Sequence, residues 1–254
     1  LEIKRLGFSI PENVGMNSKV LTKIDSIANY AISKKMTPGI QVVVARKGKV
    51  IYQKSFGNHT YESTQKVNNT DVYDIASLTK IVATLPNVMQ EFDQGHLTLE
   101  TKLKTMLPEA KNSNKANATV LVMLTHQARF QPWIPFYKAT LDSLNRPSTH
   151  YYRREFSTEF PIHVADELYL RKDYNDSIVK TILDSELLPK KQYKYSDFTF
   201  IILKEYLERK TKQPLEVLSQ KNFYSSLGMN NTLYNPLTKL DKNHIVPSEI
   251  DNYF

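Results

Sequence analysis

A change of hydrophobic periodicity at Pro38 and Gly39 constrains the fold of this chain more than any other feature. Over residues 17–35, apolar side chains recur at spacings of three and four, which predicts an amphipathic helix. Residues 41–52 form two apolar runs around Gly48, which predicts a β-hairpin. A helix followed by a hairpin is a common start for an α+β domain.

Helical periodicity returns further along the chain. We predict helices over the following segments: residues 77–94, about 176–187, and 198–209. Pro86 lies inside the first of these and should kink it. Residues 97–108 predict short turns, and the polar residues 111–117 predict a surface loop. We interpret residues of about 140–192 as an insertion that shapes a pocket.

The composition is that of an ordinary globular protein. Of the 254 residues, 41% are hydrophobic and 24% are charged, which is enough for a domain with a sizeable core. The chain has no cysteine, which excludes disulfides, thiolate metal sites and a cysteine nucleophile. No apolar stretch is long enough for a membrane span, and the first residues contain no signal peptide.

A net charge of +8 raises the question of a nucleic-acid partner, because a basic surface attracts phosphate. The lysines are scattered and no nucleic-acid-binding module flanks them, so we expect no such partner. The six histidines are dispersed without a HExxH spacing, and the seven glycines form no phosphate-binding loop. We therefore expect neither a metal nor a nucleotide cofactor.

A serine and a lysine three positions apart on a helix share one face, where the amine can take the serine proton. The pattern occurs three times, as Ser63 with Lys66, Ser77 with Lys80, and Ser177 with Lys180. Only Ser77 begins a strongly apolar helix, where free N–H groups and the helix dipole favour negative charge. Burial of that helix should lower the pKa of Lys80. The alternative is that Ser77 only caps the helix and that Lys80 is exposed.

Residues 73–80, Tyr-Asp-Ile-Ala-Ser-Leu-Thr-Lys, resemble the active-serine box of the family of class C β-lactamases, D,D-peptidases and esterases. Further segments are similar to the family in the same order: Pro38 to the hairpin, residues 95–100, 123–127, 195–197, 213–215 and 227–229. The resemblance runs from about Ile24 to Pro236. It implies a β-lactamase/transpeptidase-like fold, with an antiparallel sheet flanked by helices beside a mainly helical region.

The resemblance also implies roles for individual residues. Ser77 would attack a carbonyl and become acylated, while Lys80 holds or accepts its proton. Tyr195 would complete the base network, and a nearby cation should lower the pKa of its phenol. The alternative for Tyr195 is an ordinary aromatic residue where a helix begins. We expect His126 to be a structural hydrogen-bonding residue of its turn.

The sequence departs from the family pattern at three places. Asp197 stands at a substrate-binding position where the family has asparagine, so a negative charge replaces two amide donors. Ala128, Arg129 and Phe130 replace the Ser-Gly-Leu turn of the family. No Lys-Thr-Gly or His-x-Gly motif follows Tyr195, and an oxyanion hole without a donor from that strand loses about 10²–10³ in rate.

The absence of the last motif implies that sheet strands are absent as well. A two-stranded hairpin is marginally stable alone, so we predict that the chain is part of a longer polypeptide. We predict a linker or N-terminal extension over residues 1–15 and a serine hydrolase domain, incomplete at its C-terminus, over residues 16–254. In some bacterial relatives such a domain follows a glycoside hydrolase, so an upstream glycoside hydrolase domain is a further prediction.

The resemblance implies an enzyme that hydrolyses a β-lactam, a D-Ala-D-Ala peptide or a small ester through an acyl-enzyme, without a cofactor. The leading alternative is a catalytically impaired relative that binds cell-wall peptide or a partner domain. A basic nucleic-acid binder is a third alternative. By the same resemblance, we expect a periplasmic or exported location.

Overall fold

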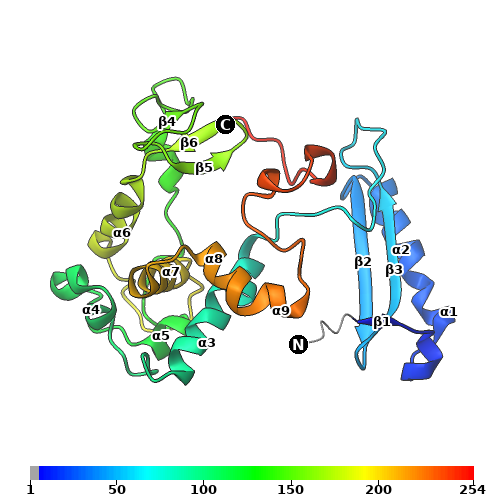
Figure 1. The fold of residues 1–254 in the computed structure, drawn as a ribbon, viewed down its shortest axis with the longest axis horizontal. Helices are drawn as coiled ribbons and strands as arrows, with labels where there is room; N and C mark the ends of the chain where they lie inside the picture. The colour runs from blue at the N-terminus through cyan, green and yellow to red at the C-terminus, as the bar shows by residue number, and fades with distance from the viewer. Residues whose placement is uncertain (1–5) are drawn as a thin grey trace. The chain divides into compact units, whose positions relative to one another are not determined.

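The computed structural model describes residues 6–254, which form two compact units (Figure 1). In the described part, the first unit comprises residues 6–75, 226–232 and 236–250, and the second comprises residues 76–225, 233–235 and 251–254. Helices and strands occur in both, which confirms the predicted α+β class. The domain boundary at residue 16 and the insertion over residues 140–192 stay predictions.

The strands and helices alternate irregularly along the chain. The strands are β1 Gly7–Phe8, β2 Gly39–Arg46, β3 Lys49–Gly57, β4 Tyr152–Arg153, β5 Ile162–Ala165 and β6 Leu168–Leu170. The helices are α1 Ser18–Leu21, α2 Lys23–Ser33, α3 Leu85–Asp93, α4 Leu103–Met106, α5 Val120–Leu124, α6 Tyr174–Asp184, α7 Phe198–Thr211, α8 Leu215–Ser219 and α9 Ser225–Leu227. Short 3₁₀ and π-helical turns connect several of them.

The first unit is built on a three-stranded sheet in the order β1–β3–β2. β2 and β3 form the predicted hairpin, in antiparallel register with Gly39 opposite Gly57. The short β1 runs parallel to β3. Two helices, α1 and α2, replace the single helix predicted over residues 17–35, and Leu21 packs with Ile51 in the core of this unit.

The predicted N-terminal extension over residues 1–15 is described in part. Residues 1–5 lie outside the described residues. The following segment includes β1 and a 3₁₀ turn, Pro11–Val14. Val14 is buried in the same core as Leu21, so this segment packs on the first unit.

Gly57 lies at the end of the hairpin, where its backbone passes close to another segment. Its φ of 71° is in the left-handed region, and a Cβ there would lie 2.2 Å from the carbonyl oxygen of Pro38. Gly48 in the hairpin turn has a similar φ of 70°, but a Cβ there would meet nothing within 4 Å. A side chain at Gly48 would therefore add only backbone strain, whereas a side chain at Gly57 would also clash with the backbone of another segment.

The second unit is organised around one large apolar cluster. Phe198, Ile202 and Leu203 of α7 are fully buried in it, and Ile182 of α6 packs against them. α7 and α6 are the helices predicted over residues 198–209 and 176–187, with ends that differ by a few residues. A small antiparallel sheet in the order β4–β6–β5 completes the unit.

The prediction of a surface loop over residues 111–117 is wrong at Lys115, which is only 1% exposed. Its ammonium group donates hydrogen bonds to the carbonyl oxygens of Leu183 and Ser185 at the C-terminal end of α6. Such carbonyls lack a partner within a helix, and a cation there interacts favourably with the helix dipole. These contacts explain why a charged side chain is buried in a polar segment.

A helix that crosses a membrane needs about 20 predominantly apolar residues. Within residues 6–254, no helix is long and apolar enough to cross a bilayer. The longest, α7, has charged residues such as Lys204 and Glu208 along it.

We expect Gly57→Ala to lower the free energy of unfolding by about 3 kcal/mol, because a strained φ adds to a clash with backbone. Gly48→Ala has the strained φ without the clash and should cost about 1 kcal/mol. Urea unfolding followed by circular dichroism measures both values. Equal losses in the two variants would contradict the close approach at Gly57.

Candidate active site

Ser77 lies in a tight turn at the start of the helical run that contains Lys80. The turn is a 3₁₀ helix, Ala76–Leu78, and Ala76 has a φ of 44°, in the left-handed region. A non-glycine residue costs about 1–2 kcal/mol in that region, and strain of this kind concentrates at functional sites. Ser77 is exposed, so its hydroxyl can be reached from solvent.

The helix predicted over residues 77–94 is present but irregular. Its first part, Lys80–Thr84, is π-helical, and the regular helix α3 begins at Leu85. The π turn ends two residues before Pro86, the residue that was predicted to kink the helix. The irregularity at this proline is therefore a widened turn, a feature that is frequent at functional sites.

A residue from a neighbouring helical segment completes the π turn. Pro86 has no N–H, so the carbonyl oxygen of Val82 lacks its usual helical donor. The buried Tyr224 hydroxyl donates to this oxygen at 3.1 Å. Asn222 also donates to Asn87 Oδ1 at 2.9 Å, between the same two segments. These bonds hold the part of the helix that carries the lysine.

Tyr195 and Asp197 lie on the short segment that leads into α7. Backbone hydrogen bonds tie this segment to the turn after α5, from Lys194 to the carbonyl of His126 at 2.8 Å and from Asp197 to that of Pro132 at 2.9 Å. Asp197 is the N-cap residue of α7, but its side chain makes no capping hydrogen bond. Its carboxylate is therefore available to the site.

His126 supports the same segment. Its Nδ1 accepts a hydrogen bond from the N–H of Ser196 at 3.2 Å, and its ring lies 4.6 Å from that of Tyr195. Burial, together with the positive charge of Lys80, lowers the pKa of His126 and favours the neutral ring that can accept this bond. The predicted hydrogen-bonding role of His126 is confirmed.

Arg129 occupies the turn where the family has glycine. Its φ of 63° keeps the left-handed conformation that glycine adopts easily. Its Nε donates to the carbonyl oxygen of Leu188 at 2.5 Å, and the neighbouring Phe130 is buried. The replacement thus preserves the turn and anchors it to the segment after α6.

The four site residues predicted from the sequence meet at one point. Lys80 Nζ donates to Ser77 Oγ at 2.9 Å and lies 2.7 Å from Asp197 Oδ1. The same nitrogen lies over the ring of Tyr195, 5.1 Å from its centroid. The Lys80 side chain is 15% exposed, whereas Tyr195 is 42% exposed. The cluster therefore has a shielded cation and a phenol that solvent can reach.

The charges in this cluster set its protonation state. Burial alone would lower the pKa of Lys80, but Asp197 and Tyr195 outweigh burial and raise it. The prediction of a lowered Lys80 pKa is therefore wrong, because it considered burial without a carboxylate from another helix. Hydrogen bonding to Lys80 and to Ser77 lowers the pKa of Tyr195, in the predicted direction. The lysine is thus an ammonium ion, and the phenol of Tyr195 loses its proton more easily than that of an ordinary tyrosine.

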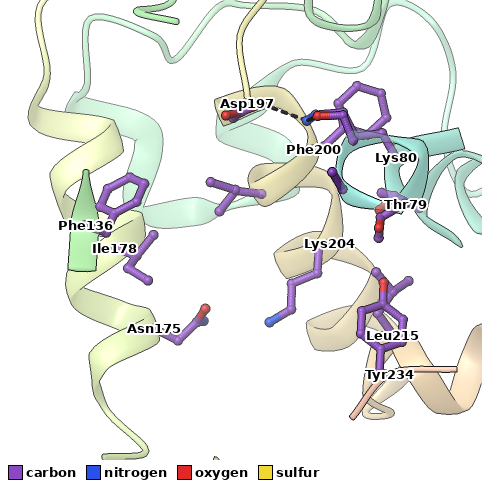
Figure 2. Close-up of a pocket in the computed structure, with 14 residues that line it drawn as sticks. Thr79, Lys80, Phe136, Asn175, Ile178, Asp197, Phe200, Lys204, Leu215 and Tyr234 are labelled. Atoms are coloured by element: carbon purple, nitrogen blue, oxygen red, sulfur yellow. Dashed lines mark hydrogen bonds and ion pairs between the residues drawn. The ribbon is translucent and has the colours of Figure 1, made fainter. Parts of the chain in front are cut away.

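A pocket of about 440 Å³ opens beside the cluster and is lined by Ser77, Lys80 and Asp197 (Figure 2). Figure 2 shows Asn175 and Ile178 of α6 on one side of it. It also shows the side chain of Lys204, from α7, pointing away from Lys80 and toward the side of the pocket where Asn175 lies.

These three residues of the pocket wall, Asn175, Ile178 and Lys204, were not predicted from the sequence. Lys204 lies seven positions after Asp197, which is two turns along one face of a predicted helix, so its place on the pocket wall could have been inferred. Asn175 and Ile178 lie in the predicted insertion, where no pattern connected them with Ser77.

The Beta-lactamase family model matches residues 28–244, so the chain belongs to this family. It is 26% identical over 241 residues to the N-acetylmuramyl-L-alanine amidase of Bacillus subtilis (strain 168), covering 90% of this chain and 49% of that protein. It is 24% identical over 246 residues to a protein named as a D-alanyl-D-alanine carboxypeptidase in Escherichia coli (strain K12), covering 91% of this chain and 51% of that protein. The chain spans about half the length of these curated relatives.

Solved structures agree with the family assignment at the level of the fold. The octameric penicillin-binding protein homologue from Pyrococcus abyssi is similar with a TM-score of 0.65 and 18% identity, covering 89% of this chain and 47% of that one. A class C β-lactamase from Rhodobacter sphaeroides is similar with a TM-score of 0.56 and 19% identity, covering 82% and 49%. The predicted β-lactamase/transpeptidase-like fold is confirmed.

We expect Tyr224→Phe to slow covalent labelling of Ser77 by a fluorophosphonate by about tenfold. The reason is that the carbonyl of Val82 would lose its donor and the π turn would shift. Tyr152→Phe is a matched control, because the buried hydroxyl of this β4 residue bonds with Thr140, in the 3₁₀ turn Phe136–Thr140, at 2.8 Å. The measurement is the labelling rate per folded molecule. Equal slowing in both variants would contradict a positioning role for Tyr224.

Proposed function

We propose that the chain carries the nucleophile and the base of a serine hydrolase that cleaves an amide bond of a cell-wall peptide. The observation that supports this most strongly is the hydrogen bond from Lys80 Nζ to Ser77 Oγ beside an open pocket. The names of the two curated relatives favour an amide substrate, because an amidase and a carboxypeptidase each break a C–N bond.

In this mechanism, the phenolate of Tyr195 takes the hydroxyl proton of Ser77 as Oγ bonds to the carbonyl carbon of the substrate. The ammonium group of Lys80 already donates to Oγ, so the serine hydrogen is directed away from it and toward the phenol. Tyr195 then gives the proton to the amine nitrogen as the C–N bond breaks, which leaves an ester on Ser77. Water attacks the ester carbonyl carbon and loses a proton to the same phenolate. Tyr195 then gives that proton to Ser77 Oγ as the ester C–O bond breaks, which releases the carboxylic acid and restores the serine and the phenolate.

Asp197 has a positioning role in the same mechanism. Its carboxylate holds Lys80 in the charged form, and that charge stabilises the phenolate of Tyr195. Lys80 acts in this scheme as a fixed cation, and the proton moves between Ser77 and Tyr195.

A catalytically impaired domain that binds cell-wall peptide or a partner domain is the alternative. It would use the same pocket without acylation of Ser77. A cell-wall substrate implies an exported location in either case, and an upstream glycoside hydrolase domain stays a prediction.

We expect Ser77→Ala to abolish covalent labelling by a fluorescent penicillin or a fluorophosphonate and to slow amide hydrolysis by about 10³-fold or more. Ser177→Ala is the matched control, because Ser177 has the same spacing to Lys180, which pairs with Asp184 on an exposed face of α6. Intact-mass measurement after labelling shows whether each variant carries the covalent label. Labelling that survives in Ser77→Ala would contradict the proposal, and a native protein that labels with neither probe would favour the binding alternative.

We expect the acylation rate to follow a bell-shaped pH profile, with its acid limb set by Tyr195 and its alkaline limb by Lys80. The Asp197 charge raises the pKa of both groups, so Asp197→Asn should shift both limbs to lower pH. Asp184→Asn removes the same charge from an exposed ion pair and should leave the profile in place. An alkaline limb that stays fixed or moves up in Asp197→Asn would contradict this assignment.

A further inference from the structure

A second pocket, of about 280 Å³, lies in the second unit between the small sheet and the start of α6. It is lined from three places along the chain: the region of β4, the turn before β5, and the segment between β6 and α6. Apart from one phenylalanine, every lining side chain is arginine, lysine, histidine, aspartate or glutamate. The proposed mechanism uses none of these residues.

Part of this lining is an ion pair that is already satisfied. Arg171 Nε donates to Asp173 Oδ1 at 2.7 Å, and its Nη2 donates to the other oxygen of the same carboxylate. Arg171 Nη1 lies 2.9 Å from His150 Nε2, and because a guanidinium group only donates, the ring nitrogen accepts. The charges of Arg171 and Asp173 cancel, so this part of the lining offers no net charge to a ligand.

Arg153 is held in place but keeps one edge of its guanidinium group free. Its Nη1 donates to the carbonyl oxygens of Thr149 and Tyr152, the second at 2.8 Å. Its guanidinium carbon lies 4.3 Å from the ring centroid of the buried Phe160. For Nε and Nη2 the structure shows no hydrogen bond or ion pair with any of residues 6–254. These are the same two groups with which Arg171 holds a carboxylate in this pocket.

Two further charged side chains line the pocket without a partner. The N–H of Lys172 donates to the carbonyl oxygen of Glu159 at 3.0 Å, which ties the two backbone segments together. Neither side chain makes a hydrogen bond or ion pair with any of residues 6–254. With Arg171 and Asp173 cancelled, the lining has two positive charges, on Arg153 and Lys172, and one negative charge, on Glu159, so its net formal charge is +1. One negative charge on a ligand balances it.

We propose that this pocket binds a single carboxylate group, with the free edge of Arg153 as its fork and Lys172 as a second cation. A carboxylate is planar, as the edge of a guanidinium group is, and it carries one negative charge. A phosphate monoester carries between one and two, and Glu159 disfavours the second. The inference goes beyond the proposed function and does not depend on acylation of Ser77.

Nitrogen-15 NMR of the full chain tests this proposal through two signals at the pocket, the Nε–H of Arg153 and the backbone N–H of Lys172. The probe is N-acetyl-D-alanine, which has one carboxylate. Its matched control is N-acetyl-D-alaninamide, in which a neutral amide replaces that carboxylate. Sodium chloride at equal ionic strength measures the effect of salt alone.

We expect the acid to shift both signals to saturation and the amide to bind about tenfold more weakly or less. Arg153→Lys keeps the charge but removes the fork, so the Lys172 signal should report about tenfold weaker binding. Arg146→Lys is the matched control, because Arg146 pairs with Asp142 outside the pocket. Glu159→Gln removes a like charge and should tighten binding about threefold, a gain that a misfolded variant would not produce.

Acetate separates the two sources of a carboxylate. Binding of acetate as tight as that of N-acetyl-D-alanine would support a site for small free acids, and tighter binding of the larger acid would support the end of a peptide. Shifts that sodium chloride reproduces, or equal binding of the acid and its amide, would overturn the proposal. Inorganic phosphate that binds more tightly than the acid would also overturn it, as would equal weakening in Arg153→Lys and Arg146→Lys. The reactivity of Ser77 with a fluorophosphonate is measured separately, so either proposal can fail while the other holds.

Discussion

The ion pair between Lys80 and Asp197 is the interaction on which the rest of the site depends. It joins the helical run after Ser77 to the segment before α7, and it keeps the lysine charged although its side chain is shielded. A charged lysine donates to Ser77 Oγ and lowers the pKa of Tyr195. In the mechanism that we propose, this one electrostatic contact therefore removes the lysine from the role of base and leaves that role to the phenolate of Tyr195.

The surrounding structure serves to place the two ends of this ion pair. On one side, the π turn Lys80–Thr84 is held by a hydroxyl from Tyr224, which replaces the donor that Pro86 lacks. On the other side, backbone bonds and the neutral ring of His126 fix the segment that carries Asp197. Both supports are hydrogen bonds between segments that are distant in the sequence. They involve buried or partly buried groups, which are costly to leave unpaired, and so define one geometry.

Much of this architecture was predictable from the sequence, and what was missed has a common physical cause. Apolar periodicity predicted the hairpin and α7, because an element that buries one face has apolar residues at the spacing of that face. The spacing of Ser77 and Lys80, with the resemblance to a family, also indicated which residues would meet. The direction of the Lys80 pKa shift and the burial of Lys115 were missed because their partners, a carboxylate and the carbonyls at the end of α6, are distant in the sequence. Local patterns predict elements well, but they do not show which distant polar groups will pair.

In the proposed mechanism, Lys80 is a fixed ammonium ion and Tyr195 is the group that gains and loses a proton. Carbon-13 NMR of protein labelled at tyrosine Cζ, with the Tyr195 signal assigned by Tyr195→Phe, measures this titration directly. We expect Tyr195 to titrate below the ordinary value of about 10 for a tyrosine, and we expect this shift to depend on Lys80. A Tyr195 signal that titrates at or above that value would contradict the mechanism.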